Sequence, residues 1–168
     1  MRNIFLVIGI LVSSAIYAPQ SFAKQNTVKT NYQGLTEIVE INGKNKDQIF
    51  EDSRVWIAKN FNSANDVIQY ADKSSGQIIA KGITGLTCLP EMSKLQCMGY
   101  SSIRFAFTLI IDVKDNKARL KVENVHYIQN VNAGVREEIE KRMAESQFAQ
   151  LIKQYRDDLN QSPKSVDW

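Results

Sequence analysis

Two cysteines, Cys88 and Cys97, are the residues of this chain whose chemistry is easiest to assign from type and spacing. In an oxidising compartment, two cysteines nine positions apart most simply form a disulfide. On the chain-entropy model, a closed loop of that size stabilises a fold by about 2.5–3 kcal/mol. The alternative is a redox-active pair, but such pairs usually have Cys-x-x-Cys spacing at the start of a helix. We therefore expect a structural disulfide.

The single histidine, His126, gives little support to a catalytic or metal site. Zinc and similar metals need His, Cys or carboxylate ligands clustered at ligand spacing, and the sequence contains no such cluster. A Ser-His-Asp or Cys-His site would have to use this histidine, and no nucleophile elbow accompanies it. Gly76, Gly82 and Gly85 fall in an expected hairpin and loop, not in a phosphate-binding turn. We expect a structural histidine, no metal and no cofactor.

Adjacent carboxylates occur at Glu51–Asp52, Glu137–Glu138 and Asp157–Asp158. All three pairs fall on the expected solvent faces of helices, so we interpret them as solvated surface. Glycosidases use two carboxylates that folding can bring together from distant positions. A hydrolase with dispersed acidic residues therefore stays open as an alternative.

The first 23 residues are typical of a secretory signal peptide. Arg2 gives a positive start, residues 4–16 form an apolar run, and the small residues Ser21 and Ala23 fit a peptidase site. We expect cleavage between Ala23 and Lys24. The apolar run is too short to span a bilayer comfortably. We therefore expect a periplasmic or secreted protein whose mature part has no transmembrane segment.

The remainder has the size and composition of one ordinary domain. Residues 24–33 are polar without periodicity and predict a flexible lead-in, residues 34–160 predict a single α+β domain, and residues 161–168 predict a frayed tail. The formal net charge is only +3, with 21 basic and 18 acidic residues intermixed. Nucleic-acid binding through counterion release needs a stronger basic excess. We therefore exclude nucleic acid as the partner.

Helices are expected in two regions. Asn45 and Gln48 have capping-box spacing and predict a helix over residues 46–61, in which we interpret Trp56 as core packing. In the C-terminal third, Asn132 is the expected cap. The apolar positions 135, 139 and 143 lie about half a turn from the apolar cluster of residues 148–159, at about 100° per residue. This offset predicts a kink or a second helix near residues 144–147, with Ser146 as a new N-cap.

Alternating apolar residues predict strands elsewhere. Residues 35–41 form one, and residues 66–71 and 77–83 form a short hairpin around a polar cluster. Residues 84–100 are expected to be a long stapled loop or a short excursion hairpin. Residues 103–113 and 118–127 predict a long central hairpin around Asp115–Asn116.

Folding the long hairpin there sets its register. Val113 then faces Ala118, Leu109 faces Val122, and Asp112 faces Arg119, which is consistent on both faces of the sheet. The same register places His126 opposite Phe105 and Tyr127 opposite Arg104. The other face carries mixed charge, which is usual for a solvated surface. The alternative is a recognition surface that uses ionic complementarity. Its candidate residues are Arg104, Thr108, Arg119, Lys121 and Tyr127, next to Asp112 and Glu123.

Part of the chain closely resembles a bacterial family known as a domain of unknown function with a TBP-like fold. The matching residues are Gly43, residues 55–61, residues 63–69 and residues 76–82, and residues 104–127 continue the likeness less specifically. The resemblance implies a curved antiparallel sheet of about five strands, in the order β-α-β-β-β-β-α, with helices on one face. It supplies no catalytic or ligand residues, and the Cys88–Cys97 loop departs from the family's usual pattern. The TBP-like label concerns architecture and does not imply DNA binding.

These observations predict an exported, non-catalytic binding module of the cell envelope. Its partner is an envelope protein or a small apolar ligand held between helix and sheet. One alternative is an inhibitor or immunity protein that neutralises an envelope-targeting toxin or hydrolase. The hydrolase with dispersed acids and a purely structural envelope component are further alternatives.

Overall fold

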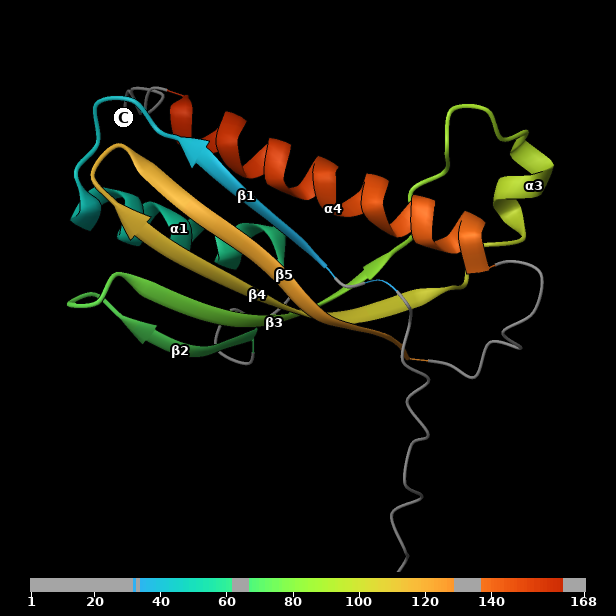
Figure 1. Cartoon of the computed structure of the whole chain (residues 1–168), viewed down its shortest axis with the longest axis horizontal. Helices are drawn as coiled ribbons and strands as arrows, with labels where there is room; N and C mark the ends of the chain where they lie inside the picture. Colours follow the sequence, from blue (N-terminus) through green and yellow to red (C-terminus); the bar gives the residue numbers. More distant parts are fainter. Residues whose placement is uncertain (1–31, 33, 62–66, 129–136, 162–168) are drawn as a thin grey trace, which may run out of the picture.

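The structure of this chain is a computed structural model that describes residues 32, 34–61, 67–128 and 137–161 (Figure 1). The strands are β1 (Leu35–Glu40), β2 (Ile68–Asp72), β3 (Gln77–Gly85), β4 (Arg104–Lys114) and β5 (Lys117–Tyr127). The helices are α1 (Lys46–Asn60), α3 (Lys94–Met98) and α4 (Glu137–Asn160). The fold is α+β, as predicted. The expected signal peptide, the lead-in except Tyr32, the tail after Gln161 and the expected cap Asn132 lie outside the described residues.

The five strands of the described part form one antiparallel sheet in the order β1-β5-β4-β3-β2. The hairpin of β4 and β5 is therefore central, as predicted. Its register near the turn is also the predicted one, because Val113 faces Ala118 and Asp112 faces Arg119. Asn116 in the turn has a φ of 59°, the left-handed region that tight hairpin loops require and that asparagine tolerates.

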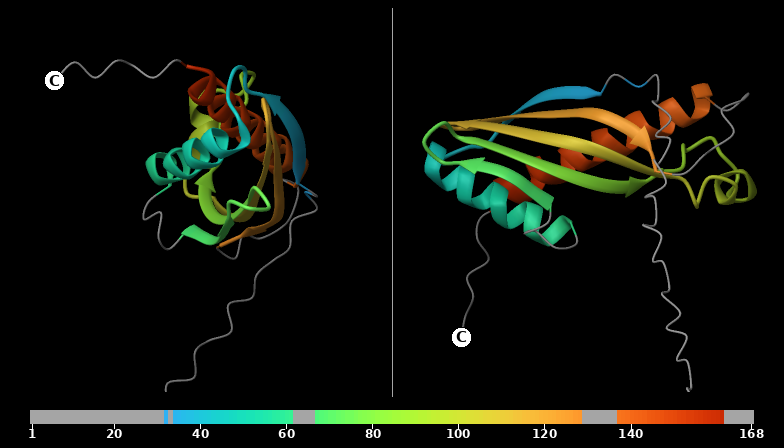
Figure 2. Two further views of the ribbon diagram at one scale, coloured as in Figure 1. Left: turned by 90° about the vertical axis from the view of Figure 1, so that its left-hand side faces the viewer. Right: turned by 90° about the horizontal axis from the view of Figure 1, so that it is seen from below.

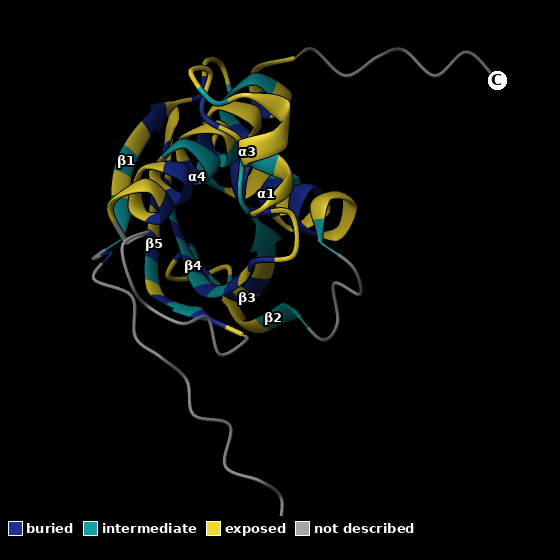
Figure 3. Ribbon diagram, turned by 90° about the vertical axis from the view of Figure 1, so that its right-hand side faces the viewer, coloured by how far each residue is buried: buried dark blue, intermediate teal, exposed yellow. Residues whose placement is uncertain are grey.

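Helices α1 and α4 cover one face of this sheet (Figure 2). Alternate side chains of β4 point to that face, and they are buried from Phe105 to Val113 while their neighbours are not. The sheet curves around the helices (Figure 3), and the alternating buried residues of β3, β4 and β5 face the helices on its inner side. The opposite face of the sheet is convex, and no described helix covers it.

Helix α1 begins as the sequence predicted. The side chain of Asn45 accepts a hydrogen bond from the backbone of Gln48, and the Gln48 side chain accepts one from the backbone of Asn45. Trp56 is 3% exposed, which confirms its interpretation as a core residue. Its Nε1 donates to Asp158 at 3.1 Å and so joins α1 to the end of α4.

Helix α4 is continuous, so the predicted kink near residues 144–147 was wrong. Ser146 lies inside the helix and starts no new one. The inward stripe runs through small and polar residues that the apolar pattern did not include, because Ala144 and Glu140 are buried while Ile139 is exposed. The buried residues of α4 are Glu140, Met143, Ala144, Phe148, Ile152, Tyr155 and Leu159. No described helix is long and apolar enough to cross a membrane.

Strand β5 contains an irregularity that the predicted register missed. Asn124 has a φ of 54°, and the pairing with β4 shifts by one residue beside it. Beyond this bulge Tyr127 faces Phe105 and His126 faces Ala106. The predicted pairs of Tyr127 with Arg104 and of His126 with Phe105 were therefore wrong. One extra residue in a strand moves every later side chain to the other face.

The segment between β3 and β4 is neither of the two expected forms alone, because it contains the short helix α3. Ser93 begins this helix through a second capping box with Gln96. Cys97 lies in α3 and is bonded to Cys88, with 5.6 Å between their Cα atoms. The expected disulfide pairing is therefore present. Figure 1 shows the segment at the end of the molecule where α4 begins.

Candidate functional site

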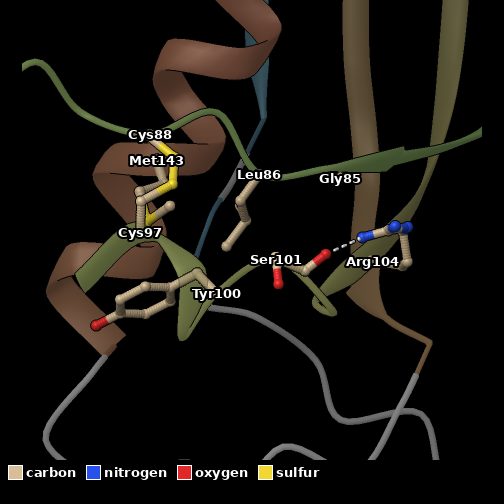
Figure 4. Close-up of a pocket in the computed structure, with 8 residues that line it drawn as sticks. All are labelled: Gly85, Leu86, Cys88, Cys97, Tyr100, Ser101, Arg104 and Met143. Carbon is tan, nitrogen blue, oxygen red and sulfur yellow. Dashed lines mark hydrogen bonds between the residues drawn. A yellow bond between two sulfur atoms is a disulfide. The ribbon is translucent and has the colours of Figure 1, made fainter. Parts of the chain in front are cut away.

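A cavity of about 360 Å³ lies beside the disulfide, at the end of the sheet where β3 stops and β4 starts (Figure 4). Four parts of the chain form it: the end of β3, the disulfide-bonded segment, the start of β4 and the first half of α4. Its lining residues are Gly85, Leu86, Cys88, Cys97, Tyr100, Ser101, Arg104 and Met143. The walls are therefore mainly apolar, with sulfur, aliphatic and aromatic groups.

The disulfide-bonded segment is tied to α4 on the side away from the sheet. Thr87 donates a hydrogen bond to Gln147, and Arg142 forms an ion pair with Glu91. The pKa of Glu91 is lowered by its own backbone N–H and by the Arg142 side chain. These contacts, with the disulfide, hold one cavity wall against the helix.

Two successive turns lead from α3 into β4 and place the other wall. The backbone N–H of Tyr100 donates to the carbonyl of Cys97 at 2.9 Å, and that of Ile103 donates to the carbonyl of Tyr100 at 3.0 Å. Tyr100 is 8% exposed, so its ring belongs to the buried part of the lining. Met143 of α4 is fully buried at the opposite wall.

Arg104 supplies the charge on the lining. Its Nη1 donates to the carbonyl oxygens of Ser101 at 2.7 Å and of Ile103 at 3.0 Å. Gly85 faces Arg104 across the β3–β4 pair, and a Cβ atom at Gly85 would lie 3.3 Å from Nη1. The glycine therefore leaves room for the guanidinium beside the backbone of β3. The first residue of β4 thus places a cation, held by two hydrogen bonds, next to an apolar cavity.

The predicted recognition residues do not come together around this cavity. Only Arg104 lines it. Thr108, Arg119 and Lys121 lie on the convex face, away from the helices. Tyr127 does not belong to that face, because the bulge turns it inward, where it is 8% exposed and donates to Glu140.

The charges of the convex face are paired within the sheet. Arg119 binds Asp112 at 2.7 Å, and Lys121 binds Glu123 at 2.5 Å. Partial burial raises the pKa of Asp112, but hydrogen bonds from Gln77 and Arg119 lower it more, and the net shift is downward. These ionic groups therefore already have partners in the protein.

Several other groups considered from the sequence also have partners in the protein. The Nδ1 of His126 contacts the carbonyl of Asn124 at 2.8 Å. Asp52 pairs with Lys44 at 2.6 Å, and Asp157 pairs with Lys153 at 2.8 Å. Within the described residues, no group of three or more His, Cys, Asp or Glu side chains could hold a metal ion.

The sequence alone did not identify most of the cavity. Leu86, Tyr100, Ser101 and Met143 carry no motif, and they meet only because the segment after β3 folds back onto α4. The available signal was the segment itself, since residues 84–100 combine glycine, proline and both cysteines between two strands. Long connections of this kind often carry function.

The family model of a domain of unknown function with a TBP-like fold, DUF4468, matches residues 35–128, which is more than half of the chain. The chain belongs to the DUF4468 family. The match includes all five strands and both cysteines of this DUF4468 domain. The TBP-like fold expected from the resemblance is therefore confirmed.

Two solved structures have the same fold. One is a TBP-like protein from Parabacteroides distasonis, with a TM-score of 0.59 and 12% sequence identity over 79% of this chain and 96% of the other. The second is a DUF4468 family protein from Bacteroides ovatus, with a TM-score of 0.51 and 14% identity over 84% and 94%. No curated protein matches the chain. At such identities the likeness describes architecture alone.

Proposed function

We propose that this chain is an exported binding module of the cell envelope that holds a small apolar ligand in the cavity beside the disulfide. The observation that carries the proposal is the cavity. Its volume of about 360 Å³ lies in the range of small-molecule sites, about 300–1,000 Å³. Its apolar walls with one fixed polar contributor, Arg104, also match the usual composition of such sites.

The chemistry of the lining favours binding over catalysis. Arg104 and Tyr100 are the lining residues with ionisable side chains. Neither a carboxylate nor a histidine, the side chains that most often transfer protons in enzymes, is among the lining residues. General acid–base catalysis works best with a group whose pKa lies near the operating pH. The lining thus offers contacts and one positive charge, but no group suited to moving a proton at neutral pH.

Export is supported by the signal peptide expected from residues 1–23 and by the disulfide. Disulfides form and persist outside the reducing cytosol. The disulfide is part of the cavity wall, so the complete binding site depends on a compartment in which the disulfide can form.

The test uses a neutral apolar fluorophore, N-phenyl-1-naphthylamine, added to the protein purified after export. We expect its emission to rise and shift to the blue with the native protein. Leu86→Trp, which places an indole in the cavity, should abolish the change. The matched control is Ile83→Trp, because Ile83 is 63% exposed on the convex face of β3, three residues before Leu86. No emission change with the native protein, or equal changes in both variants, would refute the proposal.

A second candidate function is protein recognition through the convex face, as in an inhibitor or immunity protein. Three large apolar side chains favour it, since Ile38, Tyr70 and Ile83 are 62%, 46% and 63% exposed. They lie on the uncovered side of β1, β2 and β3. We expect the protein to slow hydrolysis of peptidoglycan by envelope extract. Tyr70→Ala with Ile83→Asp should remove that effect, and an unchanged hydrolysis rate would exclude this function.

A further inference from the structure

We propose that the ligand is an aliphatic monocarboxylate, whose carboxylate binds Arg104 at the cavity edge and whose chain lies along Leu86 and the disulfide. This inference rests on the proposed function, because it requires that the cavity hold an apolar molecule. It adds the chemical class of the ligand and the residue that recognises its charged end.

Arg104 lacks a carboxylate partner among the described residues, unlike the other arginines described there. Four other arginines of the described residues each have a carboxylate partner: Arg54, Arg119, Arg142 and Arg156 bind Glu51, Asp112, Glu91 and Asp157. Arg104 has none among the described residues, and its contacts there are to backbone carbonyls. A cation fixed beside an apolar cavity is therefore available to an anion from outside the chain.

The guanidinium of Arg104 is oriented by two hydrogen bonds to the backbone. The two carbonyl contacts use both hydrogens of Nη1. They leave the edge formed by Nε and Nη2, whose parallel N–H groups match the two oxygens of a carboxylate. Because Nη1 is held at two points, the plane of this edge is fixed before a ligand arrives. A preordered donor pair loses less conformational entropy when it binds.

The cavity lining combines one positive charge, on Arg104, with mainly apolar surface. One guanidinium neutralises one negative charge, which favours a monoanion over a phosphate dianion. The rest of the lining offers the disulfide, Leu86 and Tyr100 to a hydrocarbon chain. Each methylene group buried there should raise the affinity about fourfold. A molecule with a carboxylate at one end and a chain at the other satisfies both requirements.

Gly85 contributes to this specificity by its lack of a side chain. A Cβ atom at this position would lie 3.3 Å from Nη1, closer than ordinary van der Waals contact. Gly85→Ala should therefore displace the guanidinium and weaken carboxylate binding, while the apolar walls stay in place. Gly85 is accordingly a positioning residue for Arg104.

The experiment measures the binding of octanoate and octan-1-ol to the protein purified after export, by calorimetry below the concentration at which either probe aggregates. We expect octanoate to bind about tenfold more tightly than octan-1-ol, because a hydrogen-bonded ion pair adds to the same apolar contact. Hexanoate should bind more weakly than octanoate by about fourfold for each missing methylene.

Variants of Arg104 separate the contribution of the guanidinium to binding from that of the apolar contact. Arg104→Gln should bind both eight-carbon probes equally, and Arg104→Lys, which keeps the charge without the paired donors, should fall between it and the native protein. The matched control is Arg119→Gln, since Arg119 is paired with Asp112 on the convex face. It should behave as the native protein does. Thermal unfolding of each variant confirms that it is folded.

The outcomes distinguish this inference from the function on which it rests. If the native protein binds octanoate and octan-1-ol equally, the assignment of a carboxylate is overturned and an apolar site remains. If it binds neither probe, the assignment is also overturned, and the fluorophore experiment decides whether the apolar site stands. If Arg119→Gln loses the preference for octanoate as Arg104→Gln does, the preference belongs to the general surface charge, and Arg104 is not the recognition residue.

Discussion

Ser53 and Tyr155 join α1 to α4 through a hydrogen bond of 2.7 Å between two fully buried side chains. Ser53 also donates its hydroxyl proton to the carbonyl of Ile49 at 2.6 Å, so Tyr155 must be the donor in the pair. Burial raises the pKa of the Tyr155 phenol, which therefore keeps the proton it donates. In this hydrogen bond Tyr155 is thus the donor and Ser53 the acceptor.

This difference between donor and acceptor predicts unequal effects of substitution. Tyr155→Phe leaves Ser53 bonded to Ile49 and should lower the free energy of unfolding by about 1 kcal/mol. Ser53→Ala leaves a buried phenol without its acceptor and should lower it by about 1–3 kcal/mol. Urea denaturation measures both effects. In the double variant, Tyr155→Phe should recover part of the loss caused by Ser53→Ala. A simple sum of the two losses would contradict the assignment of donor and acceptor.

At the scale of single residues, contacts within one element were predictable and contacts between elements were not. Asn45 and Gln48 are three positions apart, so the capping box follows from spacing alone. Ser53 and Tyr155 are 102 positions apart, and their meeting depends on how α1 and α4 pack against each other. Arg104 was predicted as a recognition residue, but its place at a cavity depends on the fold of the segment before it.

At the scale of elements, the bulge of β5 decides which face receives the last residues of the strand. Before Asn124 the residues Ala118, Leu120 and Val122 point to the core, and after it Val125 and Tyr127 do. Strict alternation along the sequence would have continued the first pattern. The break depends on a left-handed backbone conformation that asparagine permits but that its presence does not require.

Substitution at Asn124 should reveal this backbone requirement. Glycine adopts the left-handed region without steric conflict, whereas a β-branched residue does not. We expect Asn124→Val to be less stable than Asn124→Gly by about 1–2 kcal/mol in urea denaturation. Both variants lose the 3.4 Å contact of the Asn124 side chain with Thr108, so their difference isolates the backbone. Equal stabilities of the two variants would show that β5 does not require a left-handed backbone conformation at position 124.

The polar ladder across β5, β4 and β3 should give the sheet a measurable pH dependence. Asp112 accepts hydrogen bonds from Arg119 and Gln77, and its pKa in the folded protein is lowered. Its carboxylate therefore stabilises the fold above the unfolded pKa of about 4, and that contribution is lost as the pH falls through the folded pKa.

The comparison of the native protein with Asp112→Asn tests this ladder. At pH 7 the native protein should have the higher Tm, and the difference should narrow by pH 3. The control is Thr36→Ala at an exposed position of β1, which changes no titratable group, so its difference from the native protein should be the same at both pH values. A constant difference for Asp112→Asn would show that its carboxylate does not contribute through its charge.

At the scale of the whole molecule, the curved sheet and its two covering helices leave one end to be closed by other means. The disulfide-bonded segment does this, and it brings together the end of β3, the start of β4 and the first half of α4. The strands themselves and the central hairpin were predictable because hydrophobic alternation is local. The cavity was not predictable, because its walls come from four parts of the chain that share no sequence pattern.

The segment also links stability to export, which gives the last prediction. If residues 1–23 direct the chain out of the cytosol, the exported protein should begin at Lys24 and contain the Cys88–Cys97 bond, as mass spectrometry can show. The same chain without residues 1–23, made in a reducing cytosol, should have free thiols.

The free energy of unfolding measures what the bond contributes. It should be lower for the reduced protein by up to about 2.5–3 kcal/mol, the chain-entropy value for a loop of this size, and oxidation should restore it. Because α3, Thr87 and Glu91 still hold the segment in the reduced form, the native contacts themselves should change little. The control is Cys88→Ser with Cys97→Ser, whose stability should not respond to oxidation. An exported chain that retains Met1 or has free thiols would contradict export through the signal peptide, and stability that is insensitive to the redox state would contradict the structural role of the disulfide.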